Sequence, residues 1–196
     1  VSPNFTHYYE MANFYKDRKY YEKAIDFYSI ALDKITKDQT LVPKILYRRG
    51  TSYERLNNWD KAEADLKKSL EILPDQPLVL NYLAYTWIEK KINIEEALQM
   101  LKRAVELDEG NGYILDSLGW AHYTNKNYII AEDFLRQAVE LMPLESVIND
   151  HYADTLWMLN KNIQARYLWK QVLDLDDIEK DLKQKVSKKL VFGLIK

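Results

Sequence analysis

Apolar and polar positions along this chain follow the period of an amphipathic helix, and the whole pattern returns about every 34 residues. The copy at residues 112–145 is the most regular. It has one run of apolar residues, a short polar link at residues 125–127, and a second apolar run that ends just before Pro143. Within each run the apolar residues lie three or four positions apart, as on one face of a helix. The pattern predicts a helix–turn–helix unit.

Small residues mark the same two points in every copy. One set is separated by intervals of 38, 35, 34 and 34 residues, and a second set lies twelve or thirteen positions ahead of it. Two such series with one shared period predict a supersecondary unit copied five times. Small side chains would let two helices cross closely, and a larger side chain at such a crossing typically costs about 1–3 kcal/mol. The first set is Ala24, Ala62, Ala97, Ala131 and Ala165, and the second is Ala12, Gly50, Ala84, Gly119 and Ala153.

The repeats predict an all-α solenoid that forms one domain. We place the five copies at residues 5–42, 43–76, 77–111, 112–145 and 146–176, so that the array spans residues 1–176. Residues 177–196 lie outside the period but still read as a helix, with Ile178, Leu182, Val186 and Leu190 four positions apart. We expect this helix to cover the apolar end of the last copy. A basic membrane-surface helix is the alternative, since the segment carries six lysines against three acids.

Composition narrows the possible functions. The formal net charge of −2 argues against a general nucleic-acid binder, and the absence of cysteine excludes disulfides, thiolate metal sites and a cysteine nucleophile. No run approaches the ~18 consecutive apolar residues of a membrane span. The three histidines are scattered and the five glycines are isolated, so no metal-binding, phosphate-binding or catalytic motif is recognisable. We therefore expect no enzyme activity, no cofactor, no metal and no small-molecule substrate.

These small residues, with the proline that closes several copies, resemble the tetratricopeptide repeat (TPR). The resemblance covers nearly 90% of the chain, about residues 5–176. It implies a right-handed superhelix of five helical pairs with a capping helix, and a scaffold for protein–protein interaction. The family usually has glycine at the turn within each pair, where this chain has Lys19, Asn57, Lys126 and Asn160. In the third copy, Asn93 and Glu96 have the spacing of a capping box for the second helix.

The resemblance also implies a binding surface, because the first helices of successive repeats line a concave groove in this family. Mapping the family's groove positions onto the copies predicts a basic patch at one end of the groove and an aromatic, acidic surface over its carboxyl half. The predicted groove residues are Lys44, Tyr47, Arg48, Asn81, Tyr85, Asp116, Trp120, Tyr123, Asp150, Asp154 and Trp157.

A peptide in this groove could stack an apolar side chain against Tyr85 and Trp120 and place a lysine or arginine beside Asp116, Asp150 and Asp154. Alternatively, the aromatic residues pack against one another or against the second helix of the next repeat. The residue pattern of repeats that clamp the carboxyl-terminal tails of chaperones is not matched. A second alternative to groove binding is self-association through an exposed repeat end, because the first copy is rich in aromatic residues such as Phe14 and Tyr15. Further helices upstream of Val1 would also cover that end.

Residues 80–195 show a narrower resemblance to the carboxyl-terminal repeats of bacterial, especially proteobacterial, TPR proteins. It is carried by strings such as GYILDSLGWAHY and INDHYADTLW. Some proteins of that group are envelope lipoproteins, including adaptors for processing proteases. The resemblance is compatible with a bacterial envelope, periplasmic or cytoplasmic location, and with membrane attachment only through a preceding segment. A protein or peptide partner is expected, but the sequence does not identify it.

Overall fold

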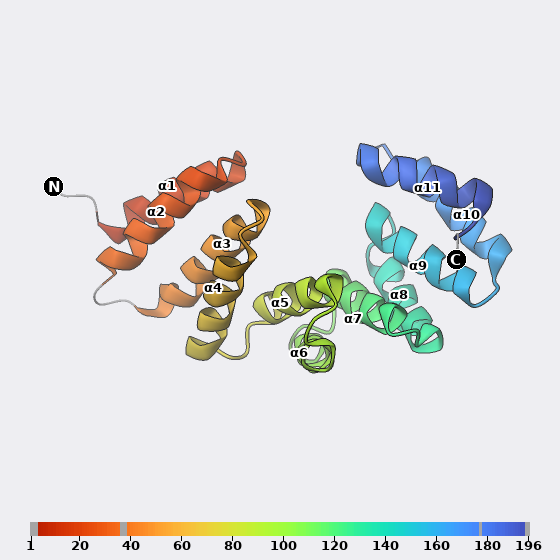
Figure 1. The fold of residues 1–196 in the computed structure, drawn as a ribbon, viewed down its shortest axis with the longest axis horizontal. Coiled ribbons are helices and arrows are strands. Elements are labelled where there is room, and N and C mark those ends of the chain that lie inside the picture. The colour runs from red at the N-terminus through yellow and green to blue at the C-terminus, as the bar shows by residue number, and fades with distance from the viewer. Residues whose placement is uncertain (1–3, 36–38, 177, 195–196) are drawn as a thin grey trace. The chain divides into compact units, whose positions relative to one another are not determined.

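The computed structural model describes residues 4–35, 39–176 and 178–194, and these residues contain helices and connecting turns but no strand. The helices form five consecutive pairs followed by an eleventh α-helix (Figure 1). They are α1 (Phe5–Asp17), α2 (Tyr21–Lys34), α3 (Val42–Arg55), α4 (Trp59–Ile72), α5 (Pro77–Lys90), α6 (Ile94–Leu107), α7 (Gly112–Thr124), α8 (Tyr128–Leu141), α9 (Ser146–Met158), α10 (Asn162–Leu173) and α11 (Lys180–Phe192), with a short 3₁₀ helix η1 (Gln39–Leu41) before α3. The predicted all-α repeat fold is confirmed.

The chain divides into two compact units, Val1–Leu83 and Ala84–Lys196, with the boundary inside α5. We call them the amino-terminal and carboxy-terminal units and describe each by itself. In the amino-terminal unit, α1 packs on α2, α2 on α3, and α3 on α4. In the carboxy-terminal unit, α6 packs on α7, α7 on α8, α8 on α9, α9 on α10, and α10 on α11 (Figure 1). These helices are therefore stabilised mainly by their neighbours in the chain.

The repeated small residues lie where the helices of a pair cross, as expected. Ala12, Ala24, Ala131 and others of the two series have no exposed surface. At Gly119 an added Cβ would lie 2.6 Å from Cγ of Leu135, which is too close for a carbon–carbon contact. Glycine at this point lets α7 approach α8 closely enough to bury Leu135.

A partly buried ion pair joins three helices of the amino-terminal unit. The Arg49 guanidinium on α3 donates to both carboxylate oxygens of Asp65 on α4, over 2.7 and 2.8 Å, and to the Ser29 hydroxyl on α2 over 3.0 Å. Burial lowers the pKa of Arg49, but its hydrogen bond and charge interaction with Asp65 raise it above its ordinary value overall. The bidentate geometry fixes α3 against α2 and α4.

The four predicted turn residues all adopt the left-handed conformation, with φ between 58° and 63° at Lys19, Asn57, Lys126 and Asn160. The third pair differs, because Lys91 and Asn93 both have positive φ there. The predicted capping box at Asn93 is wrong. Asn93 has φ 47° and ψ 38°, and its side chain makes no capping hydrogen bond, because the left-handed backbone does not have the extended geometry that a capping side chain needs.

The last helix covers the end of the fifth pair, as predicted. Val186 is fully buried against Ala153, Trp169 and Val172, and Ile178, Leu182 and Leu190 join the same apolar cluster. An Arg166 side chain on α10 donates to the carbonyl oxygen of Leu190. Among the described residues no helix is both long and apolar enough to cross a membrane.

Candidate functional site

Two of the acids predicted to line the groove form an ionic cluster with the last helix. Nζ of Lys189 on α11 donates to Asp150 over 2.7 and 2.8 Å and to Asp154 over 2.8 Å. The carboxylates are almost fully buried, with 5% and 4% of the residue surface exposed. We call these three residues the acid socket. Its two carboxylates come from one face of α9, four positions apart, and its cation comes from the capping helix.

The environment of Asp154 makes the socket sensitive to protonation. Burial, and then the charge of Asp150, raise the pKa of Asp154 to about 6, although Lys189 lowers it. The indole N–H of Trp169 donates to the other carboxylate oxygen of Asp154 over 3.1 Å. All the polar atoms of this carboxylate therefore have partners within the chain.

The third predicted acid, Asp116 on α7, is paired with a histidine of the next repeat. Its carboxylate lies 2.9 and 3.1 Å from Nδ1 of His151 on α9, and both residues are buried. Burial lowers the pKa of His151, but the charge of Asp116 and its hydrogen bond outweigh burial, so the pKa lies above its ordinary value. A protonated His151 is therefore the favoured counter-ion of Asp116.

The predicted groove aromatics of the carboxy-terminal unit pack on one another. Trp120 stacks between Tyr123 and His151, with ring centroids 4.5 and 3.9 Å apart, and its indole N–H donates to Glu89 over 2.8 Å. Trp157 lies against Trp169 at 5.4 Å, and a Cβ at Gly193 would collide with its ring.

The remaining predicted residues lie along α3 and α5. Lys44 is exposed on α3, whereas Asn81 and Tyr85 are half-buried on α5. Burial, and then the charges of Glu89 and Asp116, raise the pKa of Tyr85 above its ordinary value. Oδ1 of Asn81 is buried and has no hydrogen-bond partner among the described residues. The role of each of these residues in binding stays a prediction.

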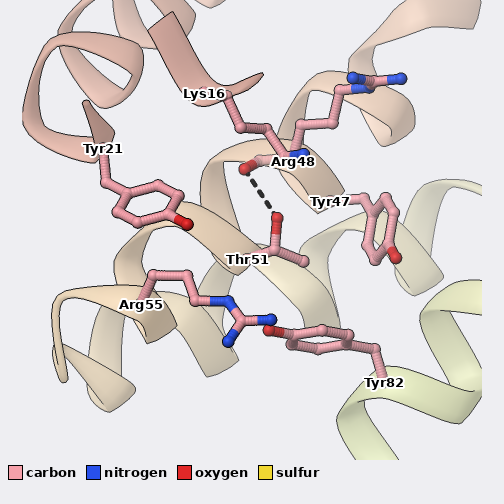
Figure 2. A pocket seen from close by; sticks show the side chains of 7 residues that line it. All are labelled: Lys16, Tyr21, Tyr47, Arg48, Thr51, Arg55 and Tyr82. Carbon is pink, nitrogen blue, oxygen red and sulfur yellow. Dashed lines mark hydrogen bonds between the residues drawn. The ribbon is translucent and has the colours of Figure 1, made fainter. Parts of the chain in front are cut away.

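The structure brings Tyr47 and Arg48 together in a pocket of the amino-terminal unit (Figure 2). The cavity has a volume of about 290 Å³. We call it the cationic pocket, because three of its seven lining residues are positively charged and none is negative. The lining residues are Lys16, Tyr21, Tyr47, Arg48, Thr51, Arg55 and Tyr82.

Several hydrogen bonds fix the walls of the cationic pocket. Arg48 donates to Oδ1 of Asn13 over 3.1 Å, and Asn13 also accepts from the hydroxyl of Tyr28 over 2.8 Å. Burial raises the pKa of Tyr28 to about 12, although Arg48 lowers it, so this hydroxyl remains a donor at neutral pH. The Thr51 hydroxyl donates to the backbone carbonyl of Arg48 over 3.0 Å, as Figure 2 shows.

Tyr82 lines the pocket beside Tyr47 and is held by an acid outside the lining, Glu54. The Tyr82 hydroxyl donates to Glu54 over 2.8 Å, and its ring meets the ring of Tyr47 edge-on at 6.1 Å. Glu54 also lies 3.7 Å from Arg55, which is mostly exposed. The guanidinium of Arg55 points into the space between Tyr21 and Tyr82 (Figure 2). Burial, followed by the hydrogen bond and charge of Glu54, raises the pKa of Tyr82, so its hydroxyl stays protonated.

Five residues of the cationic pocket are absent from the predicted groove set, although Thr51 stands at a groove position of its copy. They are Lys16, Tyr21, Thr51, Arg55 and Tyr82. Lys16 occupies in the first copy the position that Glu54 occupies in the second, so extending the groove mapping to the first copy would have found it. Arg55 and Tyr82 stand at marginal groove positions of their copies. Tyr21 begins a second helix, and repeat spacing gives no signal for it.

The described residues contain no group of three or more histidines or acids that could hold a metal ion. The polar clusters described above join carboxylates to internal cations. They position charges for structure or for recognition.

Comparisons with known proteins agree with this architecture. Tetratricopeptide repeat models match residues 43–76 and 113–142. A TPR repeat-containing protein of Pseudomonas aeruginosa is 33% identical over 99 residues, which make up 50% of this chain and 17% of that protein. The match thus spans less than a fifth of that relative.

Solved structures share the fold at low sequence identity. A tetratricopeptide repeat protein from Parabacteroides merdae has a TM-score of 0.77 at 20% identity, covering 98% of this chain and 75% of that one. A thermophilic TPR protein from Thermus thermophilus has 0.76 at 17%, covering 96% and 100%. MamA from Desulfovibrio magneticus, from its residue 41 to its end, has 0.73 at 18%, covering 89% and 97%.

The repeat fold is in general that of a protein–protein interaction scaffold, and proteins that have it are generally not enzymes. The repeated small residues, the helical pairs, the two matched repeats and these relatives together show that the chain contains tetratricopeptide repeats and is similar to bacterial proteins of that family.

Proposed function

We propose that this chain is a non-enzymatic scaffold that binds a segment of a partner protein on the face formed by the first helices of its repeats. The observation that carries the proposal is the cationic pocket. It is lined mostly by residues of first helices, α1, α3 and α5, and it presents polar groups beside flat tyrosine rings. Pockets with few convergent polar groups and aromatic walls are the usual form of a recognition site.

The acids of the carboxy-terminal unit are less suited to binding a partner than the cationic pocket, because they already hold internal cations. Asp150 and Asp154 hold Lys189, and Asp116 holds His151, so a partner's cation would have to displace a bound internal one. Trp120 already stacks on two rings. We therefore place the anchor of the partner segment in the amino-terminal unit.

Selection from a random peptide library on the immobilised protein tests this function. Selected peptides are resynthesised with a fluorophore, and their affinities are measured by anisotropy. Tyr47→Ala should weaken them about tenfold, as expected for truncating an aromatic side chain at a binding hot spot. Tyr20→Ala is the matched control, because Tyr20 is an exposed tyrosine of the same unit outside the pocket. Peptides that bind both variants equally would place the binding surface elsewhere.

Self-association is a second candidate, favoured by the outer face of α1. Met11 and Phe14 are 41% and 46% exposed there and lie beside Thr6, His7 and Glu10 around a shallow hollow. Light scattering over a dilution series separates the two functions. A dimer that Phe14→Glu abolishes would support assembly through α1, whereas a monomer at every concentration rules it out.

A further inference from the structure

We infer that the cationic pocket recognises a carboxylate side chain, so that the partner segment is acidic. This inference rests on the proposed function and names the chemistry of the segment. It reverses the expectation from the sequence, in which the acids of the carboxyl half would receive a basic segment.

The first argument is charge. The pocket gathers Lys16 from α1 with Arg48 and Arg55 from α3. Neither Lys16 nor Arg48 forms a salt bridge with any described residue. Arg55 lies 3.7 Å from Glu54, which also accepts from Tyr82. One acid beside three cations leaves a surplus of positive charge, which an anionic ligand would neutralise.

The second argument is that several hydrogen-bond donors of the pocket are available to a ligand. Arg48 uses one N–H on Asn13, which holds the side chain in place, and keeps further N–H groups for a ligand. The hydroxyls of Tyr21 and Tyr47 make no hydrogen bond to any described residue. The guanidinium forks and these hydroxyls are donors, and a carboxylate accepts two parallel hydrogen bonds from a guanidinium. A lysine or arginine of a partner would meet only like charges here.

The third argument is size. A cavity of about 290 Å³ lies at the small end of ligand pockets, so it holds one or two side chains while the rest of the segment runs outside. The rings of Tyr47 and Tyr82 form an edge-to-face corner at 6.1 Å. That corner suits an apolar or aromatic neighbour of the acidic residue. The expected ligand is an aspartate or glutamate adjacent to an apolar residue.

Synthetic peptides of matched length test this chemistry. One fluorescent decapeptide carries glutamates around a single phenylalanine, the second replaces every glutamate with glutamine, and the third replaces them with lysine. The proteins are the wild type, the variant with Lys16→Gln, Arg48→Gln and Arg55→Gln together, and Lys68→Gln. Lys68 is the control because it is a 60% exposed lysine of the same unit outside the pocket. Circular dichroism establishes that each variant is folded.

The acidic peptide should bind the wild type about tenfold or more tightly than the glutamine peptide, since charged hydrogen bonds are stronger than neutral ones. The triple variant should lose that difference, Lys68→Gln should keep it within about twofold, and added salt should weaken binding. Equal binding of the acidic and glutamine peptides, or retention in the triple variant, overturns the inference. A single-stranded oligonucleotide that binds more tightly than the acidic peptide, and is lost in the triple variant, also overturns it.

Failure of this inference is distinguishable from failure of the proposed function. If library peptides depend on Tyr47 but show no preference for acids, the scaffold function stands and the carboxylate assignment falls. If no library peptide binds and none of the three synthetic peptides binds, both are wrong.

Discussion

Replacing Lys189 with methionine would remove the cation of the acid socket and leave its shape nearly unchanged. Methionine retains most of the apolar stem, so the packing of α11 is conserved. The two carboxylates of Asp150 and Asp154 would then remain buried beside each other without the cation that bonds to both. We expect a large loss of stability in the carboxy-terminal unit.

The expected loss of unfolding free energy in Lys189→Met follows from the burial of the three charged side chains. Nζ of Lys189 makes three contacts of 2.7–2.8 Å, and the side chains of Lys189, Asp150 and Asp154 are 18%, 8% and 6% exposed. Removing one member of a buried ion pair typically costs about 3–5 kcal/mol, and the partial exposure of Lys189 puts this pair at about 3 kcal/mol. Most of that cost is the desolvation of carboxylates that water no longer reaches.

Urea unfolding followed by tryptophan fluorescence measures this loss, because Trp157 and Trp169 lie beside the socket. Lys188→Met is the matched control, since Lys188 is an exposed lysine of the same helix. It should change the free energy of unfolding by less than about 0.5 kcal/mol. If Lys189→Met costs no more than Lys188→Met, the socket does not stabilise α11 and the reasoning fails.

The pH dependence supplies a second check. The folded-state pKa of Asp154 is about 6, above the value of 3.8 expected in the unfolded chain. Above pH ~6 Asp154 is ionised and its bond to Lys189 is strongest, and below it the carboxylate takes up a proton. The difference between wild type and Lys189→Met should therefore be largest near pH ~8 and shrink toward pH ~5. A constant difference would contradict the assignment of this pKa.

Three further changes give expected outcomes in the same unfolding assay. Asp116→Asn should destabilise the chain most at mildly acidic pH, and the loss should shrink as pH rises through the raised pKa of His151. The reason is that the stability gained from a raised histidine pKa is lost when the histidine deprotonates. A loss of stability that does not depend on pH would contradict the pairing of Asp116 with His151. Gly119→Ala should cost about 1–3 kcal/mol because its Cβ would press on the neighbouring helix, whereas Gly110→Ala, with open space around it, should be nearly neutral. Lys126→Gly should raise the free energy of unfolding by up to about 1 kcal/mol, since Lys126 has φ 63°, and an unchanged or lower value would show that the turn is not strained.

The repeat architecture could be predicted because it depends on contacts between residues close in sequence. Gly119 lies against Leu135 of the second helix in the same copy, so the spacing of small residues carries the information. The left-handed turn at Asn57 follows in the same way from a position that the repeat fixes. Asn93 could not be predicted in this way, because the third copy has one extra residue near Lys91, and both Lys91 and Asn93 adopt positive φ there.

The candidate site was harder to predict because its decisive contacts join residues far apart in sequence. Asp150 has the position of a groove residue, and its burial by Lys189 depends on a helix outside the repeat. The same holds for Trp157, which Gly193 covers. In the amino-terminal unit, Tyr21 enters the pocket from a second helix that no groove rule includes. Repeat spacing predicts which way a residue faces, but not whether another segment covers it.

The two charge clusters also differ in what they can do without a partner. A buried carboxylate with no cation beside it becomes neutral by taking up a proton. The pKa of Asp154 is already raised to about 6 with Lys189 in contact. An arginine cannot become neutral in this way at physiological pH, because its guanidinium stays protonated. The acid socket is therefore stable as an internal ion pair, whereas Arg48 and Arg55 keep their charge in a half-open pocket and gain most from an anion supplied from outside. This asymmetry favours an acidic partner over a basic one.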